Sequence, residues 1–288
     1  MMWRVYRVIF HLGSPLHIGW GKVGNLQRTR PYVTGRVLWG ALTMRLTRDA
    51  ASGRGPATDS LDYQRVGEQV HHSLAFTYFY PATHAKEDYQ IAWPWQNENS
   101  FRRRFLCSYQ GTALSSFHRS AATGMLREVE FISPYTLDTG DPVFLVGYVF
   151  ERDGSTLAWQ DAFKRFQIGG ERGYGWGDVR LIRIHKTEGK QLFDGKAVFE
   201  DGAGQPGIHL PASGHLLAHT LARNLPAKGE VEPLVGREWR SHNRRHRHAG
   251  QHVEFGGVCF TPGSVVDQDS SLVIGECGIW RGMDENRS

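Results

Sequence analysis

The sequence has few cysteines, and none of them form a pair. Cys107, Cys259 and Cys277 lie far apart, with no Cys-x-x-Cys spacing among them. A disulfide framework and a zinc–thiolate site therefore have no support, and this cysteine usage is typical of a reduced intracellular protein. We expect neither a metal nor an organic cofactor.

Long apolar runs are also missing. Residues 1–10 place arginines among apolar residues, so we expect no signal peptide. No stretch approaches the roughly 18 consecutive apolar residues that a membrane-spanning helix needs. These features predict a cytoplasmic protein with no membrane partner.

Charge of one sign is in only slight excess. The 288 residues include 34 Lys and Arg against 29 Asp and Glu, a net charge of +5, with 40% hydrophobic residues. This balance is typical of a globular protein of one large or two ordinary domains. It permits a polyanionic partner without requiring one. The basic residues gather in segments 28–48, 102–104, 119–127, 165–180 and 237–247.

Apolar periodicity predicts a mixed fold. Alternation of apolar and polar residues, as in WRVYRVIFHL, predicts strands at 3–12 and 125–132. Aromatic content indicates a strand at 74–80, an apolar segment indicates a more buried strand at 142–150, and a strand at 179–185 leaves the glycine-rich loop. Helical spacing predicts helices at 37–46 and 157–166. We expect an ordered loop at 13–35, a surface loop at 49–62 and an irregular insertion at 81–100. This order is typical of an α+β domain with an antiparallel, ferredoxin-like sheet.

A second set of elements follows residue 186. We predict strands near 191–199 and 252–260, a helix near 213–224 and a basic loop at 226–251. The chain therefore divides into a domain of residues 1–186 and a second, smaller α+β domain of residues 187–288.

The glycine-rich segment Gln167–Val179 (QIGGERGYGWGDV) is the sharpest local feature. Its glycines allow positive φ angles and a close approach of the backbone to a ligand. Exposed amides and Arg172 would suit phosphate, and Tyr174 or Trp176 could stack on a base. No Lys-Ser/Thr follows, so it is not a Walker loop, and a strand in place of a helix argues against a dinucleotide fingerprint. A tight hairpin packed by aromatic residues is the alternative.

This loop, IGGERGYGWGDV, resembles the G-G-(E/D)-R-(G/S)-x-G-x-G loop of the RAMP superfamily of CRISPR proteins. SPLHIGWGKVG, RPYVTGRVLWGALTMRL and FHRSAATGMLREVEFI resemble three further segments of that family. The four segments follow the expected order between residues 3 and 185, about two thirds of the chain. The resemblance implies a ferredoxin-like (RRM-like) fold that binds guide RNA, with the second domain a degenerate copy of that fold.

The position of the loop indicates which subunit the chain resembles. In processing nucleases of the family the glycine loop lies near the C-terminus, whereas here 111 residues follow Gly177. Backbone subunits of type III complexes carry a catalytic Asp after the first strand, but Gly19–Thr34 contains no Asp or Glu. The chain most resembles the non-catalytic subunit that caps the 5′ handle of the guide. The resemblance implies a large polymerase-like subunit and backbone RAMP subunits as its partners.

Residues that could contact RNA come from four segments. Basic side chains that alternate with small residues in the first loop suit phosphates, and a basic segment near residue 245 suits RNA better than a metal, because arginines repel cations. The predicted RNA-binding residues are His17, Lys22, Arg28, Arg30, Arg36, His118, Arg119, Gly169, Gly170, Arg172, Gly173, Tyr174, Gly175, Trp176, Arg244 and Arg245.

Two other functions stay open. The first is a metal-independent endoribonuclease that cuts precursor guide RNA, with His17 or His118 as general base. The second is a protein-interaction subunit whose basic loops touch nucleic acid incidentally.

Overall fold

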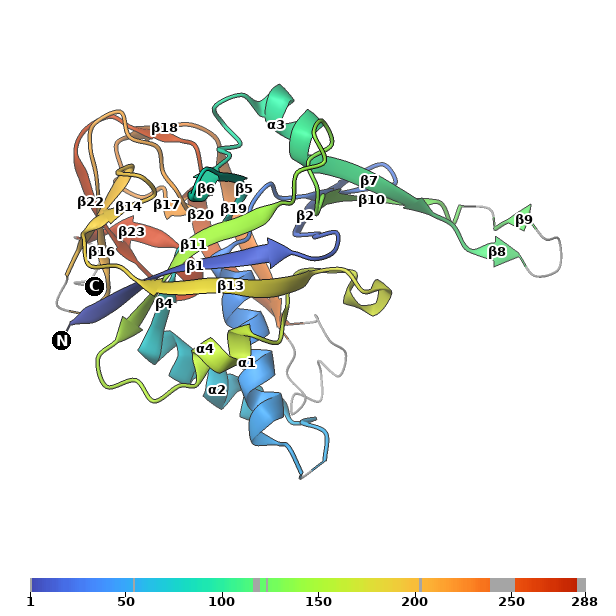
Figure 1. Cartoon of the computed structure of the whole chain (residues 1–288), viewed down its shortest axis with the longest axis horizontal. Coiled ribbons are helices and arrows are strands. Elements are labelled where there is room, and N and C mark those ends of the chain that lie inside the picture. The colour runs from blue at the N-terminus through green and yellow to red at the C-terminus, as the bar shows by residue number, and fades with distance from the viewer. Residues whose placement is uncertain are drawn as a thin grey trace.

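The computed structural model describes residues 2–53, 55–115, 120–122, 124–201, 204–238 and 252–283. A central antiparallel sheet organises the first half, with β1 between β11 and β13 (Figure 1). Its strand order is β12-β13-β1-β11-β5-β6, and β4 also pairs with β11. These strands are β1 (Trp3–Leu12), β4 (Leu74–Phe76), β5 (Tyr80–Ala85), β6 (Asp88–Ile91), β11 (Phe144–Arg152), β12 (Phe166–Gln167) and β13 (Asp178–Lys186).

Strand β1 is buried on both faces because apolar residues stand at both its odd and its even positions. Val8 and Phe10 point into a core shared with the helices, whereas Val5 and Ile9 join a second core on the opposite face. Phe10 is fully buried, and burial of such a side chain stabilises a fold by about 2 kcal/mol. The predicted strand at 3–12 therefore has its expected bounds and lies at the centre of the molecule.

Helices cover one face of this sheet (Figure 1). They are α1 (Gly35–Ala50), α2 (Ser60–Ser73) and the short α4 (Trp159–Phe163). Helix α2 begins after Asp59, whose side chain accepts a hydrogen bond from the Leu61 amide at 2.9 Å. The two predicted helices exist, but the predicted surface loop ends where the unpredicted α2 begins.

A second sheet packs against the other face. Its order is β14-β15-β16-β22-β23-β17-β20-β19. The strands are β14 (Gln191–Leu192), β15 (Ala197–Glu200), β16 (Gly207–Leu210), β17 (Thr220–Leu221), β19 (Val231–Glu238), β20 (His252–Phe260), β22 (Ser270–Ile274) and β23 (Trp280–Gly282). The pair β18 (Ala227–Lys228) and β21 (Val265–Val266) lies beside it, and the 3₁₀ turn η2 (Glu276–Gly278) precedes β23. Tyr80 and Tyr148 meet Phe193 and Trp280 in the second core, which therefore contains residues from both predicted domains.

The helix predicted near 213–224 is wrong. This segment holds Leu216, Leu217 and Ala218 fully buried in irregular backbone, and it ends in β17. The Tyr80 hydroxyl donates to the Leu217 carbonyl at 2.7 Å, so tertiary contacts replace helical hydrogen bonds. The basic loop predicted at 226–251 is also partly wrong, because its first half forms β18 and β19.

A long hairpin, the arm, projects from the body (Figure 1). Its strands are β7 (Leu106–Gly111) and β10 (Arg127–Ile132), followed outward by β8 (Leu114–Ser115) and β9 (Ser120–Ala121). The arm belongs to a four-stranded sheet of order β2-β3-β10-β7, in which β2 (Gly19–Val23) and β3 (Leu26–Thr29) form a hairpin. Helix α3 (Glu98–Phe105) leads into the arm.

Two predicted irregular regions are therefore partly regular. The first loop contains the β2–β3 hairpin, and the predicted insertion contains the β5–β6 hairpin and the start of α3. Together the elements make a mixed α+β structure with mostly antiparallel sheets and few helices. Among the described residues, no helix combines the length and apolar character needed to cross a bilayer.

Candidate RNA-binding groove

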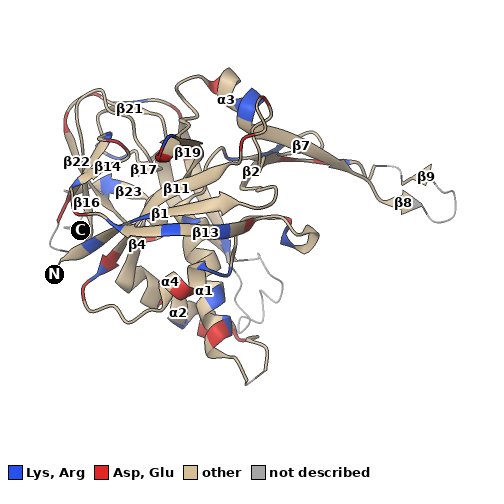
Figure 2. Cartoon of the chain, viewed as in Figure 1, with Lys and Arg blue, Asp and Glu red and all other residues tan. Residues whose placement is uncertain are grey.

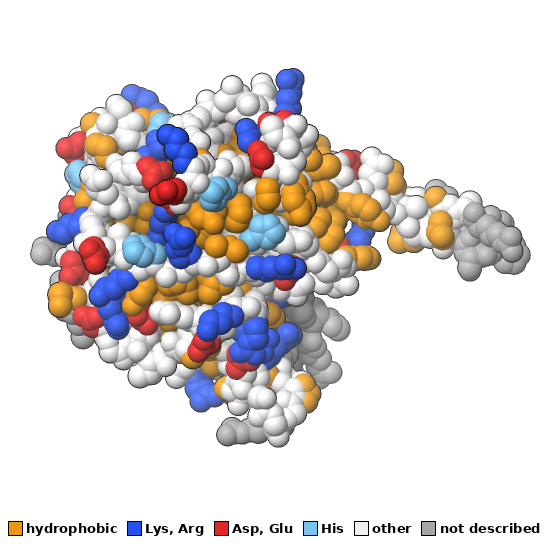
Figure 3. Space-filling view, viewed as in Figure 1, with side chains coloured by type: hydrophobic (Ala, Val, Ile, Leu, Met, Phe, Trp, Pro, Cys, Tyr) orange, Lys and Arg blue, Asp and Glu red, His pale blue; other side chains and the backbone are white. Residues whose placement is uncertain are grey.

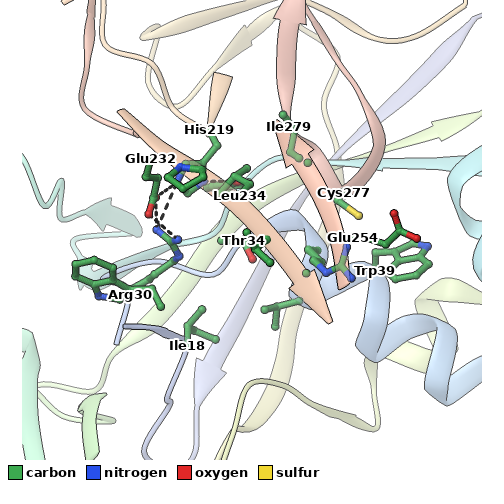
Figure 4. Close-up of a pocket in the computed structure, with 18 of the residues that line it drawn as sticks. Ile18, Arg30, Thr34, Trp39, His219, Glu232, Leu234, Glu254, Cys277 and Ile279 are labelled. Atoms are coloured by element: carbon green, nitrogen blue, oxygen red, sulfur yellow. Dashed lines mark hydrogen bonds and ion pairs between the residues drawn. The ribbon is translucent and has the colours of Figure 1, made fainter. Parts of the chain in front are cut away.

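A groove of about 1380 Å³ lies between the two halves of the chain. The β2–β3 hairpin and the start of α1 form one wall, and the β19–β20 hairpin forms the other. Four predicted RNA-binding residues line it: His17, Lys22, Arg30 and Arg36. Residues of the first loop, such as Arg30, and residues of the second sheet, such as Glu232, therefore share one concave surface (Figure 4).

An ion-pair network closes one end of the groove. The Arg30 guanidinium donates to both carboxylate oxygens of Glu232, at 2.7 and 3.2 Å. His219 Nε2 lies 2.5 Å from the same carboxylate, and its Nδ1 lies 2.7 Å from the Tyr78 hydroxyl (Figure 4). Arg30 lies 202 positions from Glu232, so this network joins the first loop to the second sheet.

The electrostatics of this network fix its protonation. Burial by itself would raise the pKa of Glu232, but hydrogen bonds from His219 and Arg30 lower it to about 2. Burial lowers the pKa of His219 and outweighs the opposing effect of the Glu232 hydrogen bond. His219 is therefore neutral, with Nε2–H donating to Glu232 and Nδ1 accepting from the Tyr78 hydroxyl. A charged carboxylate held this way keeps the Arg30 side chain in place.

Basic side chains outnumber acidic ones along the groove. Five lysines and arginines line it, against three glutamates. They are Lys22, Arg30, Arg36, Arg237 and Arg281, and the glutamates are Glu232, Glu254 and Glu276. A concave surface with this excess attracts a polyanion such as the backbone of RNA.

His17 lies where the groove meets the glycine loop. Its ring is buried, and Nδ1 donates to the Glu130 carbonyl at 2.7 Å. A Cβ atom on Gly19 would lie 2.9 Å from Nε2, so this glycine lets the chain turn tightly over the ring. The Glu130 carboxylate in turn accepts from the Thr29 amide at 3.0 Å and from Arg102. The His17 ring is thus fixed by the base of the arm, with one edge on the groove.

The inner part of the glycine loop packs against the first loop. The Gly170 amide donates to the His17 carbonyl, and the Gly177 amide donates to the Pro15 carbonyl, both at 2.8 Å. Gly169 and Gly177 have φ angles of +80° and +78°. A Cβ on Gly177 would lie 1.8 Å from the Ile168 carbonyl oxygen, so only glycine fits there. These amides bind protein carbonyls. The inner part of the glycine loop therefore fits the tightly packed turn that the sequence offered as the alternative to a ligand-binding loop.

The outer part of the loop is exposed. Arg172, Gly173 and Tyr174 form a 3₁₀ turn, η1, and Gly175 follows it with a φ of +81°. Tyr174 is 71% exposed. The Arg127 guanidinium of the arm lies 5.0 Å from its ring centre.

The other predicted residues have separate positions. Trp176 packs edge-on against Phe131 at 5.0 Å, which anchors the loop to the arm. Arg28 lines a second cleft and lies 3.9 Å from Glu130. His118, Arg119, Arg244 and Arg245 lie outside the described residues. Within the described ranges, no three His, Cys, Asp or Glu side chains gather in a way that could hold a metal ion.

Several residues of the groove have no signal in the sequence. Tyr78, His219 and Glu232 come from separate segments, and only the packing of the second sheet brings them to Arg30. Trp20 has a signal, because it stands between two glycines in a basic loop.

Comparisons with known proteins give structural neighbours alone. No family model matches the sequence, and no curated protein does. A chain of a type III-B Cmr-β complex bound to cognate target RNA and AMPPnP aligns with a TM-score of 0.47 and 11% identity, over 90% of this chain and 85% of that one.

Two further chains come from Cmr-β complexes, one bound to cognate target RNA and one in the apo state. Both have a TM-score of 0.38 and cover 62% of this chain and 96% of theirs, at 11% and 10% identity. Similarity of this extent does not establish a shared fold or function.

Proposed function

We propose that this chain is a non-catalytic RNA-binding subunit of a type III CRISPR effector complex that grips the 5′ handle of the guide RNA. One observation carries the RNA-binding part of the proposal. Lys22, Arg30 and Arg36, chosen from the sequence as phosphate-binding residues, line one groove with an excess of basic side chains.

The convergence of the motif segments supports the family. Three of the four segments that resemble the RAMP superfamily meet at His17. The first provides the histidine, the glycine loop provides the Gly170 amide bonded to its carbonyl, and the segment that contains β10 of the arm provides the Glu130 carbonyl.

The strand order supports a ferredoxin-like domain. Strands β1, β4 with β5, β11 and β13 lie in the spatial order β13-β1-β11-β4/β5, all antiparallel. Helices α1 and α2 follow β1, and α4 follows β11. We therefore propose a ferredoxin-like domain, because this order agrees with a β-α-β-β-α-β arrangement in which β4 and β5 share one position. The division at residue 186 stays a prediction.

Two observations favour a role without catalysis. Gly19–Thr34 has no carboxylate to cleave target RNA. His17, the described candidate for a general base, is buried and holds the Glu130 carbonyl. A general base must reach the proton that it removes, and burial of the His17 ring beside Gly19 restricts access to Nε2, which favours a positioning role.

Exposed apolar side chains support contacts with neighbouring subunits. The arm carries few charges (Figure 2), and apolar side chains continue from the body onto its base (Figure 3). Tyr109, Leu114, Met125 and Leu126 are each more than half exposed. Apolar surface of this kind on a projecting element suits a protein partner. We propose the large polymerase-like subunit and the backbone subunits as those partners.

The test uses the purified chain, alone and co-expressed with its partner subunits. Labelled CRISPR repeat RNA is incubated with it in EDTA, and a gel shift and a denaturing gel are run from the same samples. Binding to intact RNA supports the proposal, whereas cleavage at one discrete site would establish the endoribonuclease instead. RNA affinity that does not depend on salt would favour the protein-interaction subunit, because phosphate contacts release counterions.

A further inference from the structure

Trp20 lies on the β2–β3 hairpin where two clefts meet. It lines both the groove and a second cleft of about 550 Å³, whose other residues include Arg28, Trp95 and Arg102. Arg30 and Glu232 also line both cavities, so their ion pair forms the partition between them. A strand passing from one cleft to the other would cross Trp20.

The backbone presents the Trp20 side chain outward. Gly19 pairs with Thr29 and Gly21 pairs with Arg28, so Trp20 is the extra, unpaired residue of a β-bulge. Bulges commonly redirect one side chain next to a functional surface. Both sequence neighbours are glycines, and Trp20 remains 48% exposed.

The guanidinium groups of two arginines lie close to the indole ring of Trp20. The guanidinium carbons of Arg28 and Arg30 lie 5.2 and 5.9 Å from its centre. Ion pairs with Glu130 and Glu232 hold these arginines, and cation–π contacts hold the indole in turn. A single exposed tryptophan is ordinary on a protein surface. An indole held by two arginines at the junction of two clefts is what single-stranded nucleic acid requires, namely a flat ring beside positive charge.

We propose that Trp20 is a stacking platform for one base of single-stranded RNA, which crosses the hairpin from the groove into the second cleft. This inference rests on the proposed RNA-binding function and adds a base contact to it. The arginines attract the phosphates, and the indole contacts the base. Stacking on an indole tolerates every base, so the contact distinguishes single strands from duplexes without reading sequence.

The test compares wild-type protein with Trp20→Ala, Trp20→Phe and Tyr135→Ala, a control at an aromatic residue that is 52% exposed and lines neither cleft. Fluorescence anisotropy measures their affinity for labelled single-stranded repeat RNA and for an abasic strand with the same number of phosphates. We expect Trp20→Ala to bind the repeat RNA about tenfold more weakly, while Trp20→Phe and the control bind as wild type does. All four proteins should bind the abasic strand equally.

Two results would overturn the platform and leave the proposed function intact. The first is binding of repeat RNA by wild type and Trp20→Ala with equal affinity. The second is an equal loss by Trp20→Ala on the abasic strand, which would make the role structural. Loss of association with partner subunits alone, at unchanged RNA affinity, would assign Trp20 to a protein interface. Failure of wild type to bind any RNA would overturn both proposals. Thermal melting of each variant confirms that it is folded.

Discussion

The glycine loop and the groove lie on either side of His17, and they use their polar groups in different ways. In the inner glycine loop, backbone amides bind the carbonyls of Pro15 and His17. In the groove, side chains such as Lys22 and Arg36 line an open surface. Both regions have the residue types of a phosphate site, yet close packing explains most of the glycines. Glycine content alone therefore does not separate a ligand-binding loop from a tightly packed one.

The largest expected effect is a loss of stability, and it tests whether close packing requires the glycine at position 177. Gly177→Ala would place a Cβ on the Ile168 carbonyl at a φ of +78°. We expect a loss of about 3 kcal/mol in unfolding free energy, typical of an overpacked and strained site. The melting temperature should fall by roughly 6–12 °C. Gly173→Ala in the same loop is the control, because open space surrounds its Cβ position. Equal melting of the two variants would contradict the packing role.

Lowering the pH tests the contribution of His219 and Glu232, at the end of the groove, to the stability of the fold. Both folded-state pKa values are depressed, that of His219 below 6.5 and that of Glu232 from 4.5 to about 2. Stability from His219 is present above pH 6.5 and is lost below it. Stability from Glu232 is present above pH 4.5 and is lost as pH falls towards 2.

Glu232→Gln should therefore lower the melting temperature most near neutral pH, and its difference from wild type should shrink below pH 4.5. The measurement is a series of thermal melts across pH. A difference that stays constant down to pH 3 would show that the carboxylate charge does not stabilise the fold.

A smaller effect tests the groove as a phosphate-binding surface. Lys22→Ala should weaken RNA binding alike for all sequences and reduce the slope of log affinity against log salt by about one. Lys164→Ala is the matched control, because Lys164 pairs with Asp161 at 2.7 Å and does not line the groove. A slope that is the same for both variants would place the RNA elsewhere.

The smallest effect is expected at the exposed tip of the glycine loop. Arg172 lies on the surface, and its guanidinium approaches the Met44 sulfur at 3.2 Å. Arg172→Ala should weaken RNA binding and leave the melting temperature unchanged. Gel shifts measure the RNA affinity of this variant, and thermal melts of the same preparation measure its stability. If affinity does not change, the glycine loop contributes to RNA binding only by supporting His17.

Local pattern predicted the central elements. The alternation in 3–12 and the helical spacing in 37–46 correspond to β1 and α1, because both bury a regular apolar face. Helix α2 escaped prediction because its apolar stripe is narrow, with Val66 and Val70 as its buried aliphatic residues. The apolar spacing at 213–224 was misleading because Leu216 and Leu217 are buried by aromatic neighbours from the first half.

Long-range pairing limited prediction of the site. The basic residues of the first loop were identifiable because they alternate with small residues in one short segment. Their counterparts, Glu232 and His219, depend on β19 pairing with β20 and on the second sheet meeting the first. The sequence periodicity around His219 and around Glu232 does not indicate this pairing. In the far wall of the groove, β19 was therefore predicted as part of a basic loop, whereas the strand predicted near 252–260 corresponds to β20.

The contact between η2 and the start of α1 has a consequence for synthesis. A Cβ on Gly35 would lie 2.4 Å from the Cys277 carbonyl oxygen, so the two segments touch backbone to backbone. Five residues of this C-terminal segment also line the groove: Gly275, Glu276, Cys277, Ile279 and Arg281. During translation the N-terminal half emerges long before these residues. The nascent chain therefore has no complete groove until Arg281 has left the ribosome, so the full lining of the groove assembles only at the end of synthesis.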